Sequence, residues 1–223
     1  MDLSPEDVVR RVLDRHGRTY ADDAGIRLTD EPAPLFQLLV LAQLLSARIA
    51  AGIAVAATRE LISAGWTTPV RMRDAPRSRV VTALGRAGYR RYDERSATQL
   101  REMAELILDR YGGDLRRLAT EADDDVGRAA GLVQQVKGIG PTGAGVFLRE
   151  VQHVWPWVRP YLDERACAGA GRVGLPEDRN RLAEMVAPDD LARFAAGLVR
   201  VSLLPRGRDP FGGGPPCGGV AAV

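Results

Sequence analysis

The sequence predicts an all-α protein, and three observations support this class. Apolar residues recur at helical spacing through most of the 223 residues, and no stretch shows the alternation of a half-buried strand. Helix start and stop signals are frequent, with proline near several starts and glycine after several ends. The composition, 45% hydrophobic and 27% charged, is sufficient to bury a core in one large domain or two lobes.

The expected helices follow one another with short connections. The first covers Pro5–His16 with Ser4 as its N-cap, and the next two lie between Pro34 and Gly65, apolar nearly all round and therefore buried. The remaining expected helices cover residues 76–87, 93–111, 126–136, 142–154, 163–172, 177–186 and 188–203, with a short segment around 115–118. Residues 205–223 are rich in glycine and proline, which predicts a disordered tail.

The rarer residue types show no pattern of a metal site. Cys167 and Cys217 are too few for a four-thiolate site or a disulfide framework, and His16 and His153 lack metal-ligand spacing. No segment resembles a transmembrane helix or a signal peptide. We therefore expect a cytoplasmic protein with no metal and no membrane association.

Positive charge is concentrated in one part of a nearly neutral chain. The net charge is +2, yet residues 71–101 hold nine arginines and three acidic residues, which leaves this stretch at +6. Such a stretch is typical of a surface that binds a polyanion, although a solvated face on ordinary helices explains the charge equally well.

The segment "KGIGPTGAG", from Lys137 to Gly145, predicts a tight turn between two helices. Gly138 and Gly140 leave backbone N–H groups uncovered beside the start of a helix, where a phosphate oxygen binds without a side-chain charge. Pro141 fits the first helical position, and Lys137 adds a positive charge at the edge. A plain helix–helix turn is the alternative interpretation.

Asp163 directly precedes another expected helix. Its carboxylate would face the positive end of the helix dipole and accept hydrogen bonds from backbone N–H groups. A carboxylate fixed near a phosphate clamp suits cleavage of an N-glycosidic bond, because it can stabilise a sugar oxocarbenium ion and orient a water. The alternative role of Asp163 is that of a helix N-cap alone.

Three separated blocks resemble the helix–hairpin–helix DNA glycosylases of the endonuclease III superfamily. These are "PLFQLLVLAQLLSARIA", "VKGIGPTGAGVFL" and "VWPWVRPYLDERACAGAGRVGL", which occur in the family's order between about Pro34 and Leu175. The resemblance implies a two-lobed helical DNA-glycosylase fold over residues 1–204, with a six-helix lobe at about 48–150 and a second lobe from the N- and C-terminal helices. It also implies flipping of a base out of double-stranded DNA into a cleft between the lobes.

The resemblance assigns roles to single residues. Asp163 is similar to the family's catalytic aspartate, and Arg48 occupies the position of a side chain that fills the hole left by the flipped base. The DNA-binding residues that it implies are Lys137, Gly138, Ile139, Gly140, Thr142 and Arg48. It also implies a possible monovalent cation at the hairpin, and it places Tyr89 and Tyr92 either on a base or at the lobe interface.

The chain departs from the family pattern at three places. Thr142 stands where bifunctional members have a lysine, and an alcohol cannot form an imine, so we expect no lysine-dependent lyase activity. A single cysteine after the hairpin cannot hold the family's iron–sulfur cluster. Arg165 replaces a common histidine or asparagine, and Ala168 stands in place of the usual arginine.

Three functions remain open at this point. The first is a monofunctional DNA glycosylase that removes a damaged or mispaired base, acts as a monomer without a cofactor and is nucleoid-associated if bacterial. The second is a non-catalytic DNA-binding protein of the same fold. The third is a helical interaction module that has lost DNA binding, against which the basic stretch argues.

Overall fold

The chain folds into helices joined by short loops, which confirms the predicted all-α class. The computed structural model describes residues 3–212, and every regular element within them is helical. The α-helices are α1 (Pro5–His16), α2 (Tyr20–Ala24), α3 (Pro32–Leu45), α4 (Ala51–Ser63), α5 (Pro69–Arg73), α6 (Arg77–Arg86), α7 (Asp93–Tyr111), α8 (Arg116–Ala122), α9 (Val126–Gln134), α10 (Pro141–Val151), α11 (Glu164–Arg172), α12 (Arg179–Glu184) and α13 (Leu191–Ser202). Two 3₁₀ turns, η1 (Pro156–Val158) and η2 (Pro188–Asp190), complete the set.

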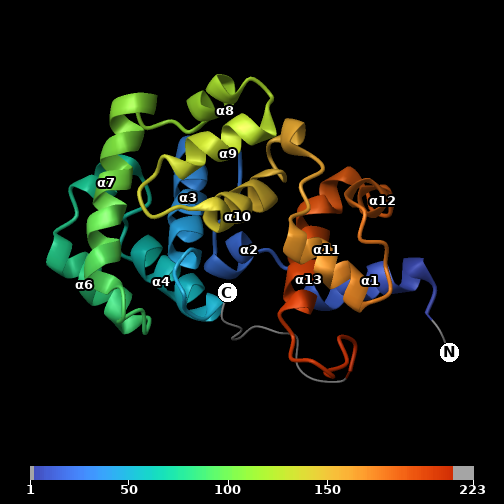
Figure 1. Cartoon of the computed structure of the whole chain (residues 1–223). Coiled ribbons are helices and arrows are strands. Elements are labelled where there is room, and N and C mark those ends of the chain that lie inside the picture. Colours follow the sequence, from blue (N-terminus) through green and yellow to red (C-terminus); the bar gives the residue numbers. More distant parts are fainter. Residues whose placement is uncertain (1–2, 213–223) are drawn as a thin grey trace.

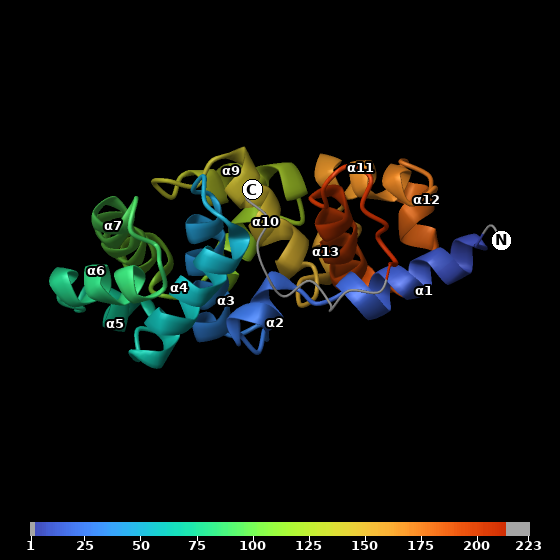
Figure 2. The ribbon, with the colours of Figure 1, turned by 90° about the horizontal axis from the view of Figure 1, so that it is seen from below.

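Two hydrophobic cores divide the described chain into two lobes. The first core contains buried side chains between Tyr20 and Val158, and the second joins α1 to residues 162–199. Figures 1 and 2 show α4–α7 at one end of an elongated molecule and α1, α11, α12 and α13 at the other. The first core also includes buried apolar side chains of α2 and α3, which precede residue 48.

Helix α10 lies where the two lobes meet. It packs against α3 and α9 of the first lobe and against α13 of the second (Figure 1). All its residues from Gly143 to Val151 are buried. Side chains on α10 can therefore contact elements of both lobes.

Small residues allow two helix pairs to approach closely. A Cβ on Gly143 of α10 would lie 2.1 Å from Oγ of Ser46, at the end of α3. A Cβ on Gly169 of α11 would lie 1.9 Å from the carbonyl oxygen of Leu198 in α13. Both glycines are therefore required for packing rather than for an unusual backbone angle.

Most predicted helices are present, but two short ones were not expected. Helix α2 begins with a capping box between Thr19 and Asp22. The helix has only 5 residues, too few for a helical apolar pattern to show in the sequence. Helix α5 is a single turn capped by Thr68. Within residues 3–212 no helix is long and apolar enough to cross a membrane.

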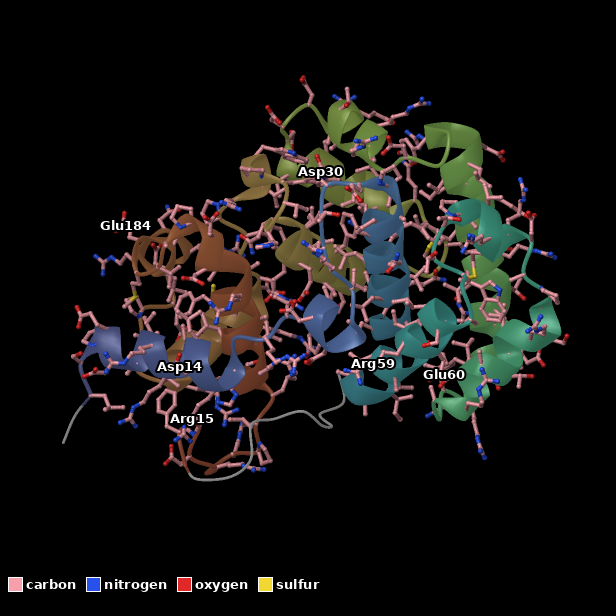
Figure 3. The ribbon with its side chains drawn as sticks, turned by 180° about the vertical axis from the view of Figure 1, so that it is seen from behind. Asp14, Arg15, Asp30, Arg59, Glu60 and Glu184 are labelled. Atoms are coloured by element: carbon pink, nitrogen blue, oxygen red, sulfur yellow. The ribbon has the colours of Figure 1, made fainter. Side chains whose placement is uncertain are left out.

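Residues 205–212, where the sequence predicts the start of a disordered tail, lie along α1. Arg15 donates to the carbonyl of Gly212 at 3.0 Å, and His16 Nε2 lies 2.9 Å from the carbonyl oxygen of Pro210 (Arg15 is labelled in Figure 3). Phe211 packs against the second core and under the guanidinium of Arg11. These contacts hold the segment against the helix, and the rest of the expected tail, with Cys217, lies outside the described residues.

Candidate active-site pocket and nucleic-acid interface

Residues 135–140 join α9 to α10 and form the predicted hairpin. Gly138 has φ +94°, a left-handed conformation that favours glycine. Ile139 is buried, with 4% of its surface exposed, and its N–H donates to the carbonyl of Val136. In contrast, the N–H groups of Gly138 and Gly140 have no acceptor within the described part of the chain. These two groups and the start of α10 offer backbone donors for an anion, while Ile139 serves as the anchor.

Lys137 is turned toward α7 rather than toward Asp163. Its Nζ pairs with Glu102 Oε1 at 2.9 Å, and its carbonyl accepts from the side chain of Gln43. Gln99, one turn before Glu102, lies against Gly138, where a Cβ would come within 2.8 Å of its amide. Helix α7 therefore contacts the hairpin directly.

Asp163 is the N-cap of α11, as the sequence predicts. Its Oδ1 accepts from the N–H of Ala166 at 2.9 Å, and its Oδ2 accepts from Nη1 of Arg149 on α10. The carboxylate side chain is 22% exposed. Gly145 faces the same carboxylate, since a Cβ there would lie 4.0 Å from Oδ2 and 3.5 Å from the hydroxyl of Tyr161. The absence of a side chain at position 145 leaves space in front of Asp163.

Arg149 and Glu150 form a pair of adjacent buried charges on α10. Glu150 accepts from the N–H groups of Tyr20 and Ala21 in the first turn of α2. Burial raises the pKa of Glu150, although the charge of Arg149 counteracts this effect. Burial by itself would lower the pKa of Arg149, but the Asp163 and Glu150 carboxylates outweigh it and raise that pKa, so the guanidinium stays charged.

A cavity of about 620 Å³ connects the start of α10 with Asp163. Its lining includes Thr142, Gly145, Arg149, Tyr161 and Asp163. We call this cavity the Asp163 pocket. Burial, and secondly the nearby Asp163 carboxylate, raise the pKa of the Tyr161 phenol, which keeps its hydroxyl protonated. The pocket thus combines a carboxylate, a guanidinium and a hydroxyl.

The structure brings together some of the predicted site residues and leaves others apart. Thr142 and Asp163 both line the pocket, and so does Arg165. Lys137, Gly138, Ile139 and Gly140 form the hairpin just before it, outside the lining. Arg48 is exposed in the turn after α3, whereas the preceding Leu45 lines the pocket.

The arginines of residues 71–101 lie on α5, α6 and α7 and in the connection between α6 and α7. Figure 1 shows α6 and α7 at the end of the molecule away from α11. Several of them pair within the protein: Arg73 with Asp74, Arg77 with Glu94, and Arg86 with Glu60, which Figure 3 labels on α4. The side chains of others, among them Arg79, Arg90 and Arg95, have no hydrogen-bond or ion-pair partner in residues 3–212. Part of the +6 stretch is therefore available for an external anion.

Tyr89 and Tyr92 differ in their surroundings. Tyr89 is 2% exposed, accepts from Ser96 and reaches the carbonyl of Leu44, so it belongs to the first core. Tyr92 is half-buried beneath the guanidinium of Arg91. Tyr89 is thus a packing residue and does not stack on a base.

Sequence reasoning missed Arg149, Gly145 and Tyr161. The available signal was the pair Arg149–Glu150 in an otherwise apolar helix, because adjacent charges on a buried helix require partners. The partner of Arg149 lies on the next helix and could not be read from spacing.

Comparison with known proteins gives a weak likeness, and only at the level of structure. No family model matches the chain, and no curated protein matches it. Among solved structures, the chain is similar to a trapped endonuclease III–DNA covalent intermediate, an estranged-adenine complex. The two share 14% identity at a TM-score of 0.47, over 88% of this chain and 85% of that one. This likeness is too weak to carry an argument about function, which therefore rests on the geometry of the site.

Proposed function

We propose that the chain is a monofunctional DNA glycosylase that hydrolyses the N-glycosidic bond of a damaged or mispaired base in double-stranded DNA. The observation that carries the proposal is the Asp163 pocket. It places a partly exposed, hydrogen-bonded carboxylate beside the helix whose N-terminal hairpin has unused backbone donors. We further propose that the protein acts as a monomer and that the hairpin binds a phosphate, with a monovalent cation there as a subsidiary prediction.

The pocket residues suggest how this reaction proceeds. As the C1′–N bond breaks, its electron pair leaves with the base, and the Asp163 carboxylate stabilises the positive charge that develops on the sugar. A water then adds to C1′ and gives up a proton, which the remaining lone pairs of Asp163 accept in the proposed reaction. Thr142 has no amine, so the proposed reaction ends at an abasic site.

The test is a single-turnover assay on duplexes that carry uracil, alkylated purines, oxidised bases or mismatches, with alkali to reveal abasic sites. We expect base release by the wild type and a loss of roughly 10²–10⁴-fold in Asp163→Asn. The matched control is Asp178→Asn, because Asp178 also caps a helix, α12, by accepting from Arg181 N at 2.9 Å. Equal base release by wild type and Asp163→Asn would show that Asp163 acts only as a helix cap.

A non-catalytic DNA-binding protein is the second candidate, and one observation favours it. Both oxygens of Asp163 already accept a hydrogen bond, one from Ala166 and one from Arg149. A carboxylate whose two oxygens are both engaged has fewer lone pairs left for a water or for the sugar. Salt-sensitive binding to every duplex without base release would select this second function.

A further inference from the structure

Arg149 is a buried cation with side-chain donors that residues 3–212 leave unused. Its side chain is 2% exposed, and its only hydrogen bond within the described residues runs from Nη1 to Asp163. Its Nε is fully buried and has no acceptor among the residues that the structure describes. A guanidinium carries N–H donors on all its nitrogens, and buried donors are nearly always satisfied. The Arg149 guanidinium therefore has donors that no acceptor within residues 3–212 uses.

The neighbours of Arg149 leave the pocket as the direction from which an acceptor can come. The Glu150 carboxylate accepts from the first turn of α2, and the Tyr20 ring lies 6.0 Å from the guanidinium carbon as a cation–π partner. Arg149 is also one of the residues that line the Asp163 pocket. A ligand in that pocket can thus satisfy donors that α2 does not.

We propose that Arg149 binds the leaving base and that the pocket selects neutral bases with carbonyl acceptors, such as deaminated or oxidised bases, over cationic alkylated purines. This inference rests on the proposed glycosylase function. A neutral base takes the electron pair of the C1′–N bond and departs as an anion until it gains a proton, whereas an alkylated cationic base departs neutral. A guanidinium stabilises the first departure and opposes entry of the second base.

Other groups in the pocket also favour a neutral base with acceptors over a cationic base. Arg165 and Arg179 line it, and neither has a carboxylate partner among the described residues. Tyr161 also lines it, and its protonated hydroxyl is a donor without an acceptor in residues 3–212. The lining also holds two carboxylates, those of Asp163 and Glu164. In the proposed reaction Asp163 faces the sugar rather than the base. Donors and positive charge therefore predominate around the space left for the base.

The first measurement compares release of uracil and hypoxanthine with release of the cationic base 7-methylguanine, each from a matched duplex. We expect the wild type to release the neutral bases faster. Arg149→Lys keeps a positive charge that can still pair with Asp163 but loses the planar set of donors, so we expect neutral-base release to fall about tenfold or more and cationic-base release to change less. Arg193→Lys is the control, because Arg193 is exposed on α13 and pairs with Asp190.

A second measurement does not depend on turnover. Free uracil or the 3,9-dimethyladeninium cation is titrated into the complex of the protein with an abasic-site duplex, and binding is followed calorimetrically. We expect uracil to bind the wild type, to bind Arg149→Lys at least about tenfold more weakly, and to bind in preference to the cation.

The outcomes separate this inference from the proposed function. Faster release of 7-methylguanine than of uracil, dependent on Asp163, would overturn the selectivity and leave the glycosylase in place. Absence of release from every duplex would overturn the glycosylase, and the titration would then decide the role of Arg149. Equal binding of uracil by wild type and Arg149→Lys, or tighter binding of the cation, would overturn that role.

Discussion

Arg149 and Glu150 are consecutive buried charges on α10, and each is compensated by a different element. Arg149 pairs with Asp163 at the start of α11, whereas Glu150 accepts two backbone N–H groups of α2. A buried charge without a partner would destabilise the fold, so each side chain requires its partner segment to be in place in the folded state. The two residues thereby connect α10 to α11 and to α2. Asp163, at the start of α11, and Tyr20, in α2, both line the pocket.

The raised pKa of Glu150 predicts a stability change with pH. Burial lifts it above its ordinary value of 4.5, so between that pH and the folded pKa the folded state holds the proton more tightly than the unfolded chain. The free energy of unfolding contributed by Glu150 therefore falls as the pH rises through this window. In Glu150→Gln this contribution is absent, so we expect the variant to gain stability relative to wild type as the pH rises.

Urea unfolding of both proteins from about pH 4 to 8 measures this difference. Glu184→Gln, on the exposed surface of α12 (Figure 3), is the control and should track the wild type. A difference between Glu150→Gln and wild type that stays constant with pH would contradict the account.

Gly145 predicts opposite effects on stability and activity. Its Cβ would meet only ordinary contacts, at 3.5 Å from Tyr161 and 4.0 Å from Asp163, so Gly145→Ala should raise the free energy of unfolding by about 0.5–1 kcal/mol. Gly145→Val fills more of the space before Asp163, and we expect base release to fall at least about tenfold. Gly131→Ala on α9, where nothing lies within 4 Å of the new Cβ, is the control that should leave release unchanged. Unimpaired release by Gly145→Val would show that the substrate does not use this space.

At the scale of helices, the approach of α10 to α3 is set by Gly143 and Ser46. A Cβ at 143 would lie 2.1 Å from Ser46 Oγ and 3.0 Å from Ile139. We expect Gly143→Ala to lower the free energy of unfolding by roughly 1–3 kcal/mol, because α10 must shift or Ser46 must rotate away from its bond to Ala42.

A double-mutant cycle tests this contact. Ser46→Ala removes the nearest atom, so we expect the combined variant to be more stable than the sum of the single changes predicts. Strict additivity, measured by urea unfolding, would show that the cost of Gly143→Ala arises elsewhere.

The helices that the sequence revealed are those whose local signals agree with their packing. Ser4 caps α1 and accepts from Asp7, and α3 is apolar all round because it is buried all round. Asp163 was found because it caps its own helix, a short-range feature. The contact of Asp163 with Arg149 joins two elements across a turn, and no periodicity encodes such a pairing.

At the scale of the whole molecule, the hairpin and the basic stretch meet through α7. Gln99 lies against Gly138, and Glu102 pairs with Lys137. Arg95 precedes Gln99 by four residues, so it lies one turn away on the same side of α7. It is exposed and has no partner among the described residues. A duplex bound at the hairpin would therefore bring a phosphate within reach of Arg95.

This placement predicts a change in the salt dependence of DNA binding. Wild-type affinity should fall steeply with salt, and Arg95→Gln should reduce the slope of log K against log salt concentration by about 0.9, because one phosphate contact is lost. Arg95→Lys should retain the slope, since a lysine also neutralises a phosphate. Arg86→Gln is the matched control, because Arg86 is already paired with Glu60 at 2.7 Å. Two results together would contradict this placement: an unchanged slope in Arg95→Gln and a weaker DNA affinity in the hairpin variant Gly140→Pro. The duplex would then bind at the hairpin but away from α7. A slope near zero in the wild type would remove DNA as the partner of either surface.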